Sequence, residues 1–211
     1  MSRFLGTDRP DRSTAARAAG FVRDDALQAR ASWVQWLRSG AARRDPSRVT
    51  YKLFVSPMPA DAPRAVAAVT NLLPDSAALG FKIPASLDGL LRPDKIVLYF
   101  ATFADAVRAG RRIDKALLGV EAHGVPLTGL IGKSAIVSWG IDPPAPTRAR
   151  QRAVLSWRTW CARAVALALE RAATRGAPPR VTAQRAIGLL ASEGVDLEHL
   201  HAPTLAATLR S

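Results

Sequence analysis

The sequence predicts an α+β fold, in which a small mixed or antiparallel sheet packs against helices and helical segments flank it at both ends of the chain. Apolar and polar residues alternate over 50–56, and a strongly apolar run covers 95–100, which predicts strands. Apolar residues at helical spacing over 62–73 and 103–118 predict amphipathic helices. The 211 residues are 48% hydrophobic and 22% charged, a composition typical of one globular domain.

The first segment, residues 1–48, is expected to be an N-terminal helical extension. Within 26–37 the larger apolar residues stand at near-helical spacing, and they are Leu27, Trp33, Trp36 and Leu37. Gly40 is the predicted stop, and the basic, proline-containing stretch 41–48 is predicted to connect this helix to an extended segment.

The second segment, 49–146, is the expected α/β core. Over 50–56 a period of two places Tyr51, Leu53 and Val55 on one face of a strand. The opposite face then carries Lys52, Phe54 and Ser56. The helix over 62–73 follows, and then an extended piece over 80–84, a loop that ends at Asp94, the strand over 95–100, the helix over 103–118 and a strand over 134–139.

The third segment, 147–211, is expected to be a C-terminal helical segment packed on the core, so that the chain forms a single overall domain. One long helix is predicted over 147–175, because Gly176 and the prolines at 178 and 179 would end it. Two short helices are predicted over 182–190 and 204–209.

The charge of the chain favours an anionic partner. Thirty Lys and Arg residues against 17 Asp and Glu give a net charge of +13, which suits nucleic acid, a membrane surface or a phosphorylated molecule. The longest apolar runs are far shorter than the roughly 20 residues that span a bilayer, and no secretory signal is evident, so we expect a cytoplasmic protein that does not enter the membrane.

Several classes of enzyme are not indicated. The chain has no glycine-rich nucleotide fingerprint, no nucleophile elbow and no multi-cysteine metal site. His199 and His201 form a close pair without a third ligand, so no metal and no cofactor are predicted. The single cysteine, Cys161, is predicted to be a small core residue rather than a nucleophile.

Four basic residues of the core stand out, because only five of the 30 basic residues are lysines. They are Lys52 within a strand, Lys82 after an aromatic residue, and Arg92 and Lys95 at the entrance to an apolar strand. An unpaired ammonium is costly to bury, so a lysine between apolar neighbours must reach solvent or meet an anion. Lys52 alone is also explained by protection of an edge strand, but the four together predict a convergent phosphate or carboxylate site.

The order of short motifs resembles the phosphothreonine lyase family, which includes type III secretion effectors and the lyase components of lanthipeptide-type synthetases. The resemblance covers about residues 50–142. It rests on Tyr51-Lys-Leu-Phe-Val-Ser-Pro57, Phe81-Lys82, Leu91-Arg-Pro-Asp-Lys95 before Ile96–Phe100, Gly124-Val-Pro126 and Val137-Ser-Trp-Gly140.

The resemblance implies elimination of phosphate from phosphoserine or phosphothreonine, with no metal or cofactor. Lys82 matches the base that removes the α-proton, while Lys52, Arg92 and Lys95 would bind the phosphate and supply a field that favours an uncharged base. Phe54 stands where the effector lyases carry a histidine that protonates the leaving phosphate, so His123, Tyr51 or Tyr99 must serve instead if the reaction is retained.

The implied partners are a phosphorylated precursor peptide in ribosomal peptide natural-product biosynthesis and a Ser/Thr kinase that prepares it. The basic terminal helices would then hold the leader of that peptide, unless they only pack. Two alternatives remain open. The substitution at Phe54 is consistent with a non-catalytic phosphopeptide- or leader-binding protein. Tryptophans at 33, 36, 157 and 160 on a basic chain also suit a nucleic-acid-binding module, although their spacing is equally typical of core residues.

Overall fold

A computed structural model of the chain describes residues 16–17, 19–24, 33–40, 50–141, 156–173 and 176–192. In the described residues, seven strands form one antiparallel sheet in the order β1-β2-β4-β5-β3-β7-β6. The strands are β1 (Phe21–Arg23), β2 (Trp33–Arg38), β3 (Tyr51–Val55), β4 (Gly80–Pro84), β5 (Ile96–Phe100), β6 (Gly129–Leu130) and β7 (Val137–Ile141).

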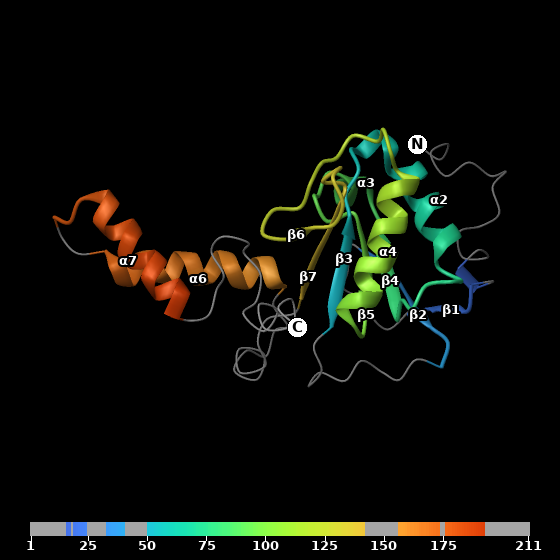
Figure 1. Ribbon diagram of the computed structural model, residues 1–211, viewed down its shortest axis with the longest axis horizontal. Coiled ribbons are helices and arrows are strands. Elements are labelled where there is room, and N and C mark those ends of the chain that lie inside the picture. The colour runs from blue at the N-terminus through green and yellow to red at the C-terminus, as the bar shows by residue number, and fades with distance from the viewer. Residues whose placement is uncertain are drawn as a thin grey trace.

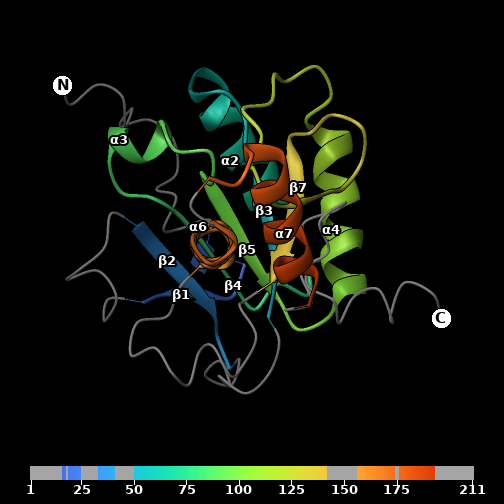
Figure 2. The same ribbon diagram turned by 90° about the vertical axis from the view of Figure 1, so that its left-hand side faces the viewer.

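Helices lie on both sides of this sheet. They are α2 (Ala62–Leu72), α3 (Leu87–Leu90), α4 (Phe103–Ala116), α6 (Trp157–Ala172) and α7 (Pro179–Ser192), with a short 3-10 turn over Pro59–Asp61. In Figures 1 and 2, α2 and α4 cover one face of the sheet, whereas α6 meets the opposite face end-on and extends away from it with α7 alongside. The predicted α+β class with an antiparallel sheet is confirmed.

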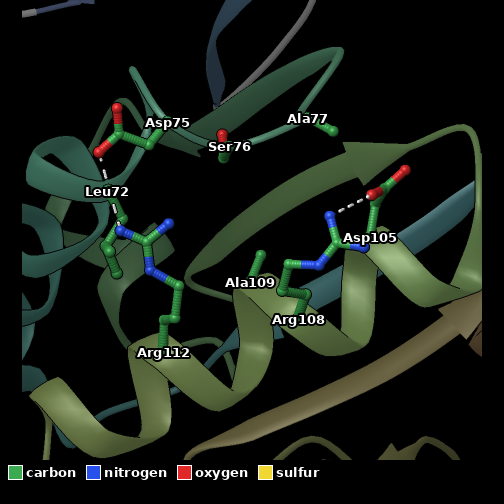
Figure 3. A pocket seen from close by; sticks show the side chains of 8 residues that line it. All are labelled: Leu72, Asp75, Ser76, Ala77, Asp105, Arg108, Ala109 and Arg112. Atoms are coloured by element: carbon green, nitrogen blue, oxygen red, sulfur yellow. Dashed lines mark hydrogen bonds and ion pairs between the residues drawn. The ribbon is translucent and has the colours of Figure 1, made fainter.

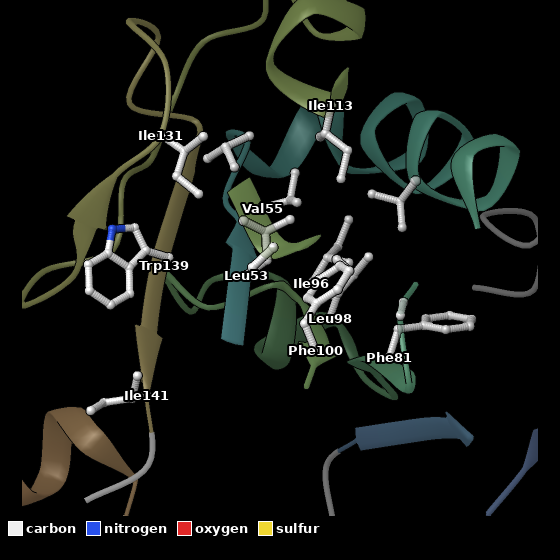
Figure 4. Packing of buried hydrophobic residues seen from close by; sticks show 14 of the residues in the cluster. Leu53, Val55, Phe81, Ile96, Leu98, Phe100, Ile113, Ile131, Trp139 and Ile141 are labelled. Atoms are coloured by element: carbon white, nitrogen blue, oxygen red, sulfur yellow. The ribbon is translucent and has the colours of Figure 1, made fainter. Parts of the chain in front are cut away.

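The main hydrophobic core lies between the sheet and the α2–α4 layer. Leu53 and Val55 of β3, Leu98 of β5 and Ile113 of α4 are almost completely removed from water (Figure 4). Burial of such side chains is the main favourable term in folding, and it explains why the face of β3 that carries Leu53 turns toward the helices. Lys52 and Phe54 must then point to the other side of the sheet.

The helix predicted over 26–37 is wrong where the structure describes it, because residues 33–38 form strand β2. Trp36 of β2 stacks on Phe81 of β4, with ring centroids 4.7 Å apart and the planes 9° from parallel. Because side chains alternate along a strand, Trp36 points into the main core and Trp33 points to the opposite face of the sheet. Pairing with β4 therefore overrides the near-helical spacing that suggested a helix.

The elements predicted over 50–56, 62–73, 80–84, 95–100 and 103–118 are confirmed as β3, α2, β4, β5 and α4. The strand predicted over 134–139 begins later, at Val137, because the backbone bends at Ser134 and Ala135, where Ala135 has a φ of 56°.

The long C-terminal helix begins at Trp157, where Ser156 caps it by accepting a hydrogen bond from the Thr159 amide. The part predicted over 147–155 and the helix over 204–209 lie outside the described residues, while α7 confirms the helix over 182–190.

α6 and α7 pack chiefly against each other, and α6 reaches the core through its first turns. The division of the chain at 48 and 146 remains a prediction. No helix among the described residues has the length and apolar character that crossing a membrane requires.

Candidate functional site

A pocket opens on the sheet face that α2 and α4 leave uncovered. Its walls combine three neighbouring strands with the beginning of α6, and the residues that line it are Lys52, Phe54, Lys82, Asp94, Val97, Ser156 and Arg158. Two of the three core lysines singled out from the sequence, Lys52 and Lys82, therefore share one pocket.

The strand register brings the lysines together. Val97 of β5 stands opposite Phe54 of β3 on one side and opposite Lys82 of β4 on the other. Tyr99, two residues along β5, stands opposite Lys52. Directly opposite residues of antiparallel strands project to the same face, so Lys52 and Lys82 flank β5 on its uncovered side. Alternation within each strand predicts this shared face only after the strand order is known.

Asp94 lies in the pocket between two arginines. Its Oδ1 is 3.1 Å from Arg92 Nε, and its Oδ2 is 2.7 Å from Arg158 Nη2. Burial acts to raise the pKa of Asp94, but hydrogen bonding by Arg92 and the charges of both arginines outweigh burial and hold that pKa below its ordinary value. The carboxylate thus draws Arg158 of α6 onto the sheet.

The aromatic ring of Trp33 contacts two cationic side chains at the pocket, Lys82 and Arg92. Lys82 Nζ lies 4.2 Å from the ring centroid and Arg92 Cζ lies 5.3 Å from it. Both are within the range of cation–π attraction. The two cationic groups can be no farther apart than these two distances together, so one phosphoamino acid can reach both. Four basic side chains, Lys52, Lys82, Arg92 and Arg158, thus lie in or beside this pocket, and a carboxylate of the pocket, Asp94, contacts both arginines.

The other two predicted site residues pair with each other. Lys95 is fully buried, and its Nζ lies 2.6 Å from Nδ1 of His123, whose side chain is exposed. Burial lowers the pKa of the Lys95 ammonium, and the nearby charge of Asp94 offsets this only in part. Neither Lys95 nor His123 is among the residues that line the pocket. Their predicted roles in phosphate binding and proton transfer remain predictions.

Phe54 forms an apolar wall where the resemblance leads one to expect a histidine. It is buried with Val97 and Val125, and Tyr99 packs against this cluster. Tyr51 packs instead on Phe103 of α4, with ring centroids 5.8 Å apart, on the helical side of the sheet. Of the two tyrosines considered as proton donors, Tyr99 therefore lies on the face of the pocket and Tyr51 on the opposite face.

Sequence reasoning missed the role of Asp94, Arg158 and Trp33. Asp94 stands inside the motif Leu91–Lys95, but a search for basic residues passes over a carboxylate. Arg158 is separated from Asp94 by 64 positions along the chain. No local pattern distinguishes it from the other arginines, and only the docking of α6 reveals it.

A second pocket, on the helical side, is a weaker candidate (Figure 3). Leu72, Ser76, Ala77 and Ala109 line it together with two pairs of opposite charge. Arg108 is 3.0 Å from Asp105, and Arg112 is 3.8 Å from Asp75. These exposed cations are already paired with carboxylates of the pocket, which leaves little excess charge for an anion.

Metal-binding and thiol chemistry find no support in the described part of the chain. No group of three or more His, Cys, Asp or Glu side chains there is arranged to hold a metal ion. The histidines at 199 and 201 lie outside the described residues. Cys161 is buried, and burial raises the pKa of its thiol to about 12, so it is confirmed as a core residue.

Comparison with known proteins shows the fold. By sequence, no family model and no curated protein matches the chain. An effector protein from Pseudomonas syringae pv. tomato strain DC3000 is similar in structure, with a TM-score of 0.58 and 17% identity over 81% of this chain and 62% of the other. A second, from Pseudomonas syringae pv. syringae strain 61, has a TM-score of 0.55 and 18% identity over 93% of this chain and 71% of the other.

The chain thus spans less than two thirds of the length of the first effector structure. The type III effector and phosphothreonine lyase OspF from Shigella flexneri is also similar, with a TM-score of 0.46 and 15% identity over 63% of this chain and 78% of the other. Two further solved phosphothreonine lyases, one of them SpvC from Salmonella, have TM-scores of 0.46 and 0.44 and are 17% and 16% identical over 63% of this chain.

Proposed function

We propose that the chain is a lyase that eliminates phosphate from phosphoserine or phosphothreonine of a peptide and leaves a dehydroamino acid. The observation that carries the proposal is the convergence of Lys52, Lys82 and Arg158 on one pocket, where Asp94 contacts Arg158 and also Arg92 beside the pocket. The order of motifs that resembles the phosphothreonine lyase family over about residues 50–142 supports it.

The reaction assigns a separate task to each side of the pocket. The uncharged amine of Lys82 takes the α-proton, the Cα–Cβ double bond forms, and the Cβ–O bond breaks so that phosphate leaves with its electron pair. Trp33 fixes the lysine from one side, since its ring lies 4.2 Å from Nζ.

Phosphate binding falls to Lys52 and Arg92, and the geometry adds Arg158 to this set. Guanidinium groups bind phosphate oxygens through paired hydrogen bonds, and fixed positive charge stabilises the dianion as the Cβ–O bond breaks. Asp94 keeps the two arginines in place before substrate binds. Lys95, the next residue after Asp94, would add its positive charge to the electrostatic attraction of the phosphate.

The leaving phosphate requires a proton or strong neutralisation, and Phe54 cannot supply a proton. We assign this role to His123, whose Nδ1 contacts Lys95 Nζ and whose side chain is exposed. With Nδ1 accepting a hydrogen bond from the lysine, the proton of a neutral imidazole resides on Nε2. Nε2 is then the atom from which the proton is donated.

The substrate must reach this pocket already phosphorylated, because the reaction removes phosphate and adds none. We therefore propose a precursor peptide as substrate, a Ser/Thr kinase as the source of its phosphate, and the cytoplasm as the place of reaction. Ribosomal peptide natural-product biosynthesis is the setting in which the dehydroamino acid would be used, and neither a metal nor a cofactor is required.

Mass spectrometry of a mixed phosphoserine and phosphothreonine peptide library incubated with the protein tests the proposal. We expect loss of one H3PO4 per reacted site, and no loss with Lys82→Ala. Lys115→Ala, which removes an exposed lysine on α4, is the matched control and should react like the wild type. Replacement of the lost phosphate by water would identify a phosphatase instead and contradict elimination.

The alternative of a non-catalytic phosphopeptide- or leader-binding protein rests on one observation, the apolar Phe54 cluster where a proton donor is expected. It predicts phosphopeptide binding that survives Lys82→Ala and yields no product. The nucleic-acid alternative is less favoured, because Trp36 and Trp160 are buried and Trp33 is covered by Lys82. Salt-sensitive RNA or DNA binding without phosphopeptide binding would reverse that order.

A further inference from the structure

The helices α6 and α7 form an arm, defined by residues 156–173 and 176–192, that extends from the sheet (Figures 1 and 2). The two helices pack on each other through small residues such as Ala168 and Ala186, and only the start of α6 approaches the sheet. Much of the surface of the arm is therefore open to solvent.

That surface is unusually apolar for exposed helices. Leu169 is 42% exposed and Ile187 is 53% exposed, and three more large apolar residues of the arm are also exposed, namely Val165, Leu167 and Leu189. A helix that lies at the surface normally keeps such residues on its buried face. Clusters of exposed apolar side chains mark surfaces at which another chain binds.

A groove runs between the two helices of the arm. Its lining is apolar apart from one arginine, and it consists of Ala164, Leu167, Ala168, Arg171, Leu189 and Leu190. Leu167 and Leu189 are both exposed and both line the groove, so the apolar surface and the groove coincide. A partner would place apolar side chains here.

The charge of the arm selects among partners. Its described residues include five arginines and one glutamate, which are Arg158, Arg163, Arg171, Arg180, Arg185 and Glu170. A second copy of the chain would bring the same excess of positive charge against this surface. An acidic segment complements it, and apolar residues on one side of that segment would fill the groove.

We propose that the arm is a docking site for an acidic amphipathic segment of the peptide substrate. The segment binds with its apolar side in the groove at Leu167 and Leu189 and its carboxylates against the arginines around it. The identification of the partner as the substrate rests on the proposed function, whereas the docking surface itself does not.

The position of α6 links the docking surface to the pocket. Ser156 and Arg158, at the start of α6, line the pocket, and Leu167 lies nine residues further along the same helix. At 1.5 Å per residue the groove is about 14 Å along the helix axis from Arg158. Nine residues are two and a half helical turns, so Leu167 and Arg158 project from opposite sides of α6. A docked substrate must pass around α6 to present a phosphorylated residue to Lys82, so its linking segment is longer than the roughly four extended residues that the axial distance alone requires.

The test uses a fluorescein-labelled 20-residue peptide designed as an amphipathic helix, with leucine on one side, glutamate elsewhere and no phosphate. We expect saturable binding by fluorescence anisotropy, weakened about tenfold or more by Leu167→Asp or Leu189→Asp. Leu118→Asp is the matched control. Leu118 is 63% exposed and lies outside the arm, so this substitution should leave the affinity for the peptide unchanged.

Two further measurements distinguish loss of binding from misfolding of the arm. Arg163→Glu and Arg180→Glu reverse exposed charges at positions that do not line the groove. The double variant should bind the glutamate-containing peptide more weakly, and it should bind a peptide with lysine in place of glutamate more tightly. Because the probe carries no phosphate, failure of elimination leaves this result intact. Absence of binding, or binding insensitive to every arm variant, would overturn the proposal. A dimer in light scattering that Leu167→Asp dissociates would show that a second copy covers the arm instead.

Discussion

Arg158 Nη2 lies 2.7 Å from Asp94 Oδ2, and this contact joins the arm to the sheet at the edge of the lysine pocket. The pair is largely withdrawn from water, with side-chain exposures of 21% for Arg158 and 10% for Asp94. An ion pair in this position interacts more strongly than one on the surface, and losing one partner leaves a charge that is poorly solvated.

Removing the arginine should therefore affect stability and substrate binding together. We expect Arg158→Ala to lower the free energy of unfolding by about 1–2 kcal/mol and to raise the KM for a phosphopeptide. Arg163→Ala, five residues along the same helix and fully on the surface of the arm, should leave unfolding unchanged in thermal denaturation. An equal loss of stability in the two variants would contradict a specific role for the contact with Asp94.

Asp94 predicts a loss of stability in acid. Its pKa in the folded protein lies below the ordinary value of 3.8, so its stabilising contribution is fully present above pH 3.8 and is lost as the pH falls through the lowered value. Denaturant titrations between pH 5 and about pH 2 should show this dependence in the wild type and a smaller one in Asp94→Asn. A slope unchanged by the substitution would mean that other carboxyl groups dominate.

Lys95 predicts a gain of stability with rising pH in the alkaline range. Burial places its folded-state pKa below the ordinary value of 10.5, so the unfolded chain binds the proton more tightly. The free energy of unfolding should consequently rise as the pH increases from the lowered value toward 10.5. Lys95→Met should abolish that rise and be as stable as the wild type at neutral pH, since an apolar side chain suits a fully buried position. A large destabilisation would instead show that the contact with His123 is required.

Phe54→His would test the missing proton donor. If departure of phosphate limits the rate, a histidine on this wall of the pocket should increase elimination by roughly 10²-fold, the lower end of general acid catalysis. The added rate should disappear above about pH 6.5, where the imidazole loses its proton. The rate and its pH profile should be compared with those of Phe54→Leu, which keeps the wall apolar. Faster elimination in both variants would indicate easier access rather than acid catalysis.

Cys161 should resist alkylation while the protein is folded. Burial raises the pKa of its thiol to about 12, so almost none of the reactive thiolate is present near pH 8. Iodoacetamide labelling followed by mass spectrometry should be slow in buffer and fast in denaturant. Rapid labelling of the folded protein would show that the α6–α7 pair opens readily.

Local sequence patterns predicted most of the core because short-range periodicity reports which face of an element is buried. Leu53 and Val55 alternate with Lys52 and Phe54, and that alternation alone placed the lysine on the side opposite the core. The same kind of evidence failed at residues 33–38, where tryptophans three apart suit either a helix or a strand. Only pairing with β4 decides between them.

The sequence by itself determined the α+β class and the faces of the central strands, since each depends on neighbours within a few positions, and it indicated Lys52 and Lys82 as candidate site residues. Tertiary structure decided which groups meet. The order β4-β5-β3 places the two lysines on either side of one strand. Asp94 and Arg158 come together only because α6 docks on the sheet. Contacts between residues so far apart depend on strand order and helix packing, which no local pattern of the chain encodes.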